Sequence, residues 1–167
     1  MKGGARVMLR KSLVLACLLA LSACETGGPV TSRPAILASV SQIMPDPDVA
    51  AFFAEEATRA GVATIEVVHL GPGGVYGDTM MTSSTRAPVV RINVDRPGGN
   101  SATNLAHEIS HAWAFRNGCY NHGERWLAYH LEIAKRFEAQ FPGVKWSGKT
   151  PTDNVMAKGA RYPNDHC

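Results

Sequence analysis

The sequence predicts one domain of the α+β class, in which a short antiparallel or mixed sheet packs on helices. A chain of 167 residues is long enough for one compact core and short for two. Two segments in the middle of the chain are rich in β-branched residues and partly alternate between apolar and polar, as strands do. Segments with the apolar spacing of helices lie before and after them.

The N-terminal segment has the order of an export signal, in which basic residues precede an apolar run. The run spans residues 13–21, and no other stretch of the chain could span a membrane. Residues 21–24 (LSAC) are similar to the bacterial lipobox, which implies cleavage before Cys24 and a lipid on that cysteine. We therefore expect residues 1–23 to be a lipoprotein signal peptide. A signal cut elsewhere and an uncleaved anchor are the alternatives.

The lipid would anchor the protein in the cell envelope, and we expect it at the outer membrane, facing the periplasm. Glu25 follows Cys24 in place of the Asp that resembles an inner-membrane retention signal. Without residues 1–23, the 17 Lys and Arg fall to 13, against 14 Asp and Glu, so the mature chain is nearly neutral. The sequence pI of about 8.8 comes from the signal, and the composition gives no support to a nucleic-acid partner.

Two cysteines, Cys119 and Cys167, remain in the mature chain besides the lipidated one. Outside the cytosol thiols can oxidise, and we expect these two to form a disulfide. The closed loop of about 49 residues would contribute about 3–4 kcal/mol to stability by restricting the unfolded chain. Two free thiols are the alternative.

The mature chain opens with a flexible tether and two predicted helices. Residues 24–34 are rich in Gly, Pro, Ser and Thr and lack apolar periodicity. A short helix is predicted over residues 35–44. A second helix covers residues 49–60, with Asp48 as its N-cap and Gly61 at its end.

Two strands follow, over residues 63–70 and 88–95. In the second, Val90, Ile92 and Val94 share one face, which can pack on helices. The segment between them is rich in turn residues, and residues 75–81 can add a third strand.

Two longer helices are predicted in the second half of the chain. The first runs from Ser101 as N-cap to Gly118 as the C′ residue. Its apolar stripe consists of Leu105, Ile109, Ala112 and Trp113. The other covers residues 123–140 and ends before a Pro-Gly pair. Residues 144–167 show little pattern, and we expect the disulfide to hold their end.

The first long helix carries the stretch HEISHAW, residues 107–113. His107 and His111 are four positions apart, so both imidazoles can reach one tetrahedral ion from the same helix face. Glu108 lies to the side, where it can take a proton from a water, which is the arrangement of the HExxH zinc peptidases. Two hydrogen-bonded histidines in an ordinary helix are the alternative.

A catalytic zinc site normally has three protein ligands and leaves the fourth position to water. The metzincin subfamily has Gly three and His six residues after the second histidine. Ala114 and Asn117 occupy these positions here, so the chain does not have the metzincin motif. A straight helical hairpin about Gly118 would bring His130 level with His111, whereas Glu132 resembles the third ligand of thermolysin-like peptidases. Spacing alone therefore leaves three candidates open, which are His122, His130 and Glu132.

The sequence around His122 resembles the SprT-like metallopeptidase family. In HEISHAWAFRNGCYNHGERWLAYHLEIAKRF, a short connection follows HExxH, and His-Gly is followed by an aromatic at the third position after Gly and by a helix. The similarity covers roughly residues 85–141. The matching residues are His107, Glu108, His111, His122, Gly123 and Trp126. The resemblance implies that residues 35–167 form one zincin-like metallopeptidase domain, with His107, His111 and His122 binding zinc and Glu108 as general base.

With His122 as the third ligand, the two rival candidates would have other roles. His130 lies eight residues, about 12 Å of helix, beyond His122, so both cannot bind one ion. We expect His130 to be buried close to the site, and Glu132 to pair with Lys135 or Arg136 on the helix surface. In zincins the strand before the active-site helix commonly pairs with extended substrate, and residues 89–94 correspond to it here. Ordinary packing within the sheet is the alternative for this segment.

These observations together predict an extracytoplasmic zinc metallopeptidase that cleaves envelope proteins or peptides, with a zinc-activated water and Glu108 as general base. The SprT-like proteins that act on DNA-bound proteins commonly carry a zinc ribbon of paired cysteines, and this chain has no CxxC pair. The chemistry of the family, and not its link to DNA, is therefore what we expect. A zinc-binding lipoprotein without activity and a zinc hydrolase acting on peptidoglycan are the alternatives.

Overall fold

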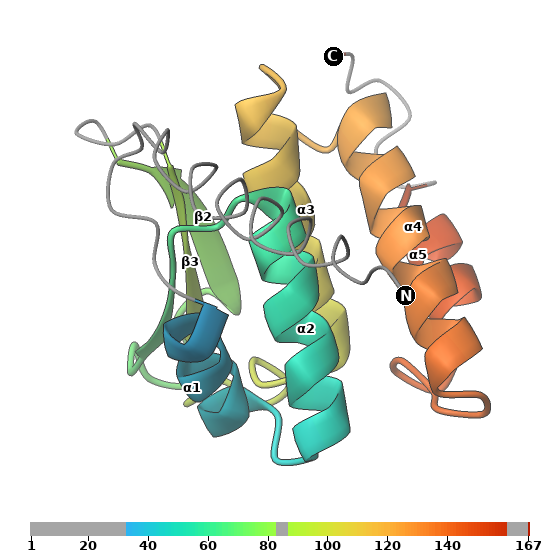
Figure 1. Cartoon of the computed structure of the whole chain (residues 1–167), viewed down its shortest axis with the longest axis horizontal. Coiled ribbons are helices and arrows are strands. Elements are labelled where there is room, and N and C mark those ends of the chain that lie inside the picture. Colours follow the sequence, from blue (N-terminus) through green and yellow to red (C-terminus); the bar gives the residue numbers. More distant parts are fainter. Residues whose placement is uncertain (1–32, 83–86, 160–166) are drawn as a thin grey trace, which may run out of the picture.

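The computed structural model describes residues 33–82, 87–159 and 167, and Figure 1 shows their arrangement. This part of the chain contains five helices and one three-stranded mixed sheet, so the α+β class predicted from the sequence is confirmed. None of these helices is long and apolar enough to cross a membrane. The elements are α1 (Arg33–Ile43), α2 (Pro47–Ala60), β1 (Thr64–Val68), β2 (Gly77–Met81), β3 (Pro88–Asn93), α3 (Ala102–Arg116), α4 (Glu124–Gln140) and α5 (Pro151–Gly159).

The N-terminal features predicted from the sequence lie largely outside the described residues. These are the signal peptide, residues 1–23, and Cys24 with most of the tether. The prediction of a tether up to residue 34 is wrong at its end, because α1 already begins at Arg33. Proline is tolerated in the first turn of a helix, where its missing N–H has no partner to lose, so Pro34 does not prevent this earlier start.

Helix α2 begins two residues earlier than its apolar pattern predicted. Its N-cap is Asp46 and not Asp48, because the Asp46 carboxylate accepts hydrogen bonds from the backbone N–H groups of Asp48 and Val49 at 2.9 and 3.1 Å. Pro47 occupies the first helical position, which suits its fixed φ angle. The helix ends at Gly61, whose φ of 72° is a left-handed conformation that favours glycine.

The sheet has the strand order β1-β3-β2, with β1 parallel and β2 antiparallel to β3. The strand that precedes α3 is therefore central, and both of its edges are used for hydrogen bonding within the sheet. The prediction that residues 89–94 pair with extended substrate is wrong for this reason. Among the described residues, β2 is the edge strand next to α3 that has no second partner.

Helix α3 lies between the sheet and α4 (Figure 1), and it packs on α2, α4, β2 and β3. Val90 and Ile92 of β3 are fully buried in this core, as their predicted alternation required. On the opposite face of the sheet, Arg91 donates hydrogen bonds to the carboxylate of Asp78. The helix that carries HEISH is thus held on two sides by well-packed elements.

The C-terminal segment contains a helix, α5, that the sequence analysis did not predict. Its start has a recognisable cap, because Thr150 Oγ1 accepts a hydrogen bond from the backbone N–H of Asp153 at 3.1 Å, and Pro151 is the first helical residue. The apolar stripe is short, with Val155 as its buried member. Helix α5 packs on α4, and Trp146 just before it is almost fully buried.

Candidate metal centre

Three histidine side chains converge at the junction of α3 and α4. The Nε2 atoms lie 3.3 Å apart for His107 and His111, 3.1 Å apart for His111 and His122, and 3.2 Å apart for His107 and His122. A tetrahedral zinc ion with Zn–N bonds of about 2.0–2.1 Å requires its ligand nitrogens to be about 3.3–3.4 Å apart. The three residues therefore fit one metal ion with small adjustment, and no other described residue belongs to the group.

The two ends of α3 place the first two histidines as the sequence predicted. Ser101 is the N-cap, and its hydroxyl accepts a hydrogen bond from the backbone N–H of Asn104 at 3.2 Å. Gly118 has a φ of 76° and ends the helix. Within the helix, His107 and His111 share one face, with ring centroids 4.9 Å apart.

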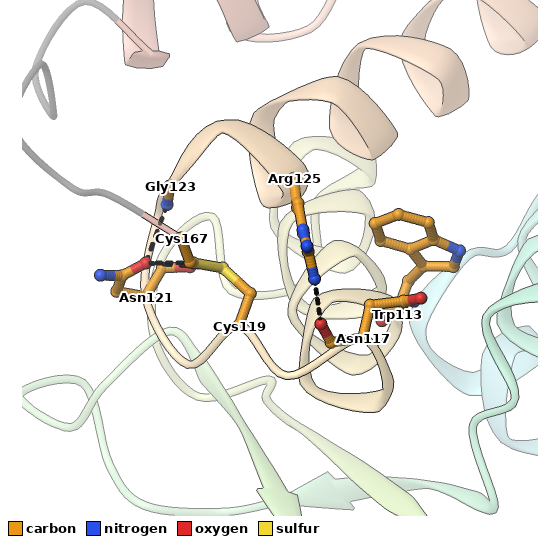
Figure 2. Close-up of a disulfide and its surroundings, with 7 residues drawn as sticks. All are labelled: Trp113, Asn117, Cys119, Asn121, Gly123, Arg125 and Cys167. Atoms are coloured by element: carbon orange, nitrogen blue, oxygen red, sulfur yellow. Dashed lines mark hydrogen bonds between the residues drawn. A yellow bond between two sulfur atoms is a disulfide. The ribbon is translucent and has the colours of Figure 1, made fainter.

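His122 reaches the same point from the connection between the two helices. This connection is tied down at both ends. Asn121 Oδ1 accepts a hydrogen bond from the backbone N–H of Gly123 at 3.1 Å, and Arg125 donates one to the carbonyl of Asn117. Figure 2 shows these contacts beside the disulfide between Cys119 and Cys167, whose Cα atoms are 5.5 Å apart. The predicted pair of cysteines is thus present, and it lies next to the loop that carries His122.

Trp126, on the first turn of α4, packs against the three histidines. Its ring centroid lies 4.6 Å from that of His122 and 4.9 Å from that of His107. Its Nε1–H donates a hydrogen bond to the backbone carbonyl of His107 at 3.3 Å. The aromatic residue of the His-Gly motif therefore joins the start of α4 to α3.

The surroundings keep the imidazoles in the form that a metal needs. Burial lowers the pKa of His111 to about 3, with a further contribution from His122. Burial, with His111 and other charges nearby, lowers the pKa of His107 well below its ordinary value. Neutral imidazoles have a free lone pair, so both side chains can bind a metal without first losing a proton.

Glu108 lies beside the cluster but is not one of its members. The residue is 5% exposed, and burial raises the pKa of its carboxyl group to about 7, against the opposite effect of a hydrogen bond from Thr79. Thr79 Oγ1 lies 2.9 Å from Glu108 Oε2. A buried carboxyl group with a pKa near neutrality is suited to accept and release a proton.

The structure separates the two rival ligands from the cluster. His130 is fully buried, and its ring centroid lies 5.8 Å from that of His107. Neither of its ring nitrogens has a hydrogen-bond partner among the described residues. Glu132 lies on the surface of α4 and accepts a hydrogen bond from Arg136 at 3.2 Å, as predicted.

Two residues near the site, Thr79 and Lys158, were not predicted from the sequence. Thr79 lies in the turn-rich segment, where no spacing indicated a contact with α3. Lys158 lies on α5, a helix that was not predicted. Burial of His130 is the main cause of its lowered pKa, and the nearby charge of Lys158 lowers that pKa further. The Thr150-Pro151 start of α5 is the signal that could have indicated a helix there.

Comparisons of the chain with protein families, with curated proteins and with solved structures find no match. The candidate site is therefore defined by its own geometry.

Proposed function

We propose that the protein is a zinc-dependent metallopeptidase with a zincin-like domain of the SprT type. The observation that supports this proposal most directly is the convergence of three Nε2 atoms, 3.1–3.3 Å apart, beside a buried glutamate. Three neutral nitrogen ligands with one open position are typical of catalytic zinc sites, whereas structural zinc sites are closed by four protein ligands.

His107, His111 and His122 would hold the ion. A bound zinc would lower the pKa of a water in its open position and polarise the scissile carbonyl. The rest of the chemistry belongs to Glu108. Its carboxylate would take a proton from the attacking water as the water oxygen bonds to the carbonyl carbon, and it would return that proton to the amide nitrogen as the C–N bond breaks.

The position of β2 supports a peptide as the substrate. Thr79 of this strand contacts Glu108, so a chain paired with the outer edge of β2 would run beside the candidate site. Edge strands recognise extended peptides through backbone hydrogen bonds, largely independently of sequence. This edge therefore takes the role that the sequence analysis had assigned to residues 89–94.

The proposed substrates are proteins or peptides of the cell envelope, and the proposed attachment is the lipid on Cys24. The disulfide between Cys119 and Cys167 is consistent with an oxidising compartment outside the cytosol. The near neutrality of the mature chain argues against a nucleic-acid partner.

The test compares zinc-loaded wild type with Glu108→Gln on an unstructured protein such as casein. The wild type should cleave it, and the variant should bind about one zinc per chain and lose cleavage by at least about 100-fold, since general-base catalysis contributes on that order. Zinc binding without cleavage by the wild type would favour a non-catalytic lipoprotein. A wild type that digests purified sacculi and leaves casein intact would favour a peptidoglycan hydrolase, and failure to bind zinc would reject the proposal.

A further inference from the structure

We infer that Thr79 is a positioning residue for Glu108, because its hydroxyl fixes one carboxylate oxygen and leaves the other to exchange the proton. The inference rests on the proposed function, since it assigns the general base a partner. It also concerns a residue from a strand that neither the HExxH motif nor the His-Gly motif includes.

The contact between the two residues is made at two points. Thr79 Oγ1 lies 2.9 Å from Glu108 Oε2 and 2.9 Å from the backbone carbonyl oxygen of the same residue. A hydroxyl group has one proton to donate, and Oε2 keeps lone pairs to accept it whether or not Oε1 carries a proton. Thr79 therefore has a hydrogen bond to offer Glu108 before and after the proton transfer.

The face of β2 next to α3 is shaped around the glutamate side chain. Side chains alternate along a strand, so positions 77 and 79 lie on the same face. Gly77 has no side chain, and a Cβ atom there would lie 2.7 Å from the backbone carbonyl oxygen of Arg91 and 3.1 Å from Glu108 Cγ. Glycine leaves room for the methylene groups of Glu108, and the next residue on that face supplies the hydroxyl for its carboxylate.

The contact has a consequence for the reaction. With Oε2 held by Thr79, rotation of the carboxylate is restricted and Oε1 keeps one direction. The Glu108 side chain is buried, so water cannot readily replace the hydroxyl of Thr79 as a hydrogen-bond donor. Without that hydroxyl, the carboxylate would turn freely or would lack a hydrogen bond. The alternative is a purely structural role, in which the Thr79 hydroxyl only joins β2 to the backbone carbonyl of Glu108. In that case, removal of the hydroxyl should lower the stability of the protein and leave kcat unchanged.

The experiment uses Thr79→Val, which keeps the shape and removes the hydroxyl, and Thr79→Ser, which keeps the hydroxyl. Thr58→Val is the matched control, because the Thr58 hydroxyl donates a hydrogen bond within its own helix, to the carbonyl of Ala54 at 2.7 Å. The measurements are zinc content, melting temperature, kcat and KM on an unstructured peptide, and the crystal structure of each variant.

We expect Thr79→Val to bind zinc as the wild type does and to lose about 10–100-fold in kcat, the range found for residues that orient catalytic groups, with KM little changed. Thr79→Ser should restore most of that loss. In the crystal structures the Glu108 carboxylate should keep its position in Thr79→Ser and leave it, or become disordered, in Thr79→Val.

The outcomes separate this inference from the proposed function. A zinc-loaded wild type without cleavage activity would overturn both. An active wild type with an equally active Thr79→Val, or with Thr79→Ser as impaired as Thr79→Val, would overturn the inference alone. If Thr79→Val does not fold, Thr79→Ala replaces it, because alanine also removes the hydroxyl without placing an apolar methyl group against the carboxylate.

Discussion

The Nε2 atom of His111 lies 3.1 Å from that of His122, although one residue ends a helical motif and the other precedes the next helix. The contact depends on the reversal of the chain at Gly118 and on the packing of Trp126 against both rings. The third position of the cluster is thus set by the connection between α3 and α4.

His122→Ala should abolish stoichiometric zinc binding, because two histidines of one helix leave the ion with half of its ligands. His130→Ala and Glu132→Ala should keep about one zinc per chain, since neither residue belongs to the cluster. Elemental analysis of the refilled, desalted proteins measures the content. Loss of zinc in Glu132→Ala with retention in His122→Ala would instead assign the protein to the thermolysin-like group.

Replacement of both Cys119 and Cys167 by Ser should lower the free energy of unfolding by about 4 kcal/mol. The two cysteines are separated by 48 positions, and the disulfide reduces the entropy of the unfolded chain by closing a loop of this length. Zinc affinity should fall as well, because Cys119 lies three residues before His122. Urea unfolding and competition with a zinc-binding dye measure the two effects. Unchanged zinc affinity with reduced stability would mean that Trp126 and the hydrogen bond from the Gly123 N–H to Asn121 are sufficient to hold the loop that carries His122.

In metal-free protein, Glu108→Gln should be more stable than the wild type at pH 8 and equally stable at pH 4. Burial raises the pKa of this carboxyl group from 4.5 to about 7. Between these values the folded protein keeps a proton that the unfolded chain releases, so stability falls as pH rises through this window, by about 3 kcal/mol in total. Urea unfolding in the presence of a chelator measures the difference. A wild type as stable as the variant at pH 8 would contradict the raised pKa.

Arg136→Ala should destabilise the protein by about 2–4 kcal/mol, because the buried carboxylate of Glu56 loses two hydrogen bonds and keeps only the longer ion pair with Arg59, at 3.8 Å. The guanidinium group joins α4 to α2 through two hydrogen bonds to this carboxylate, at 2.9 and 2.7 Å, and the Glu56 side chain is 3% exposed. Lys135→Ala, on the adjacent position of α4, is the control and should change stability by less than about 0.5 kcal/mol. Thermal unfolding of the three proteins checks the prediction, and equal effects of the two substitutions would contradict it.

Much of the local structure was predictable, because caps and apolar spacing act over a few residues. The Ser101 cap and the Gly118 stop bounded α3, and the spacing of four placed His107 and His111 on one face. The error at the start of α2 occurred where two local signals competed. Asp46 and Asp48 are both able to cap a helix, and the intervening Pro47, which fits the first helical position, decided in favour of Asp46.

By itself the sequence determined the HExxH face of one helix, since helical geometry makes residues i and i+4 neighbours whatever surrounds them. Only the tertiary structure decided which other residues meet that face. His122 and not His130 completes the cluster, β3 is central and leaves β2 as the edge, and Thr79 contacts Glu108. These contacts join residues from different elements, and their geometry depends on how the whole core packs, which no pattern of a few neighbouring residues specifies.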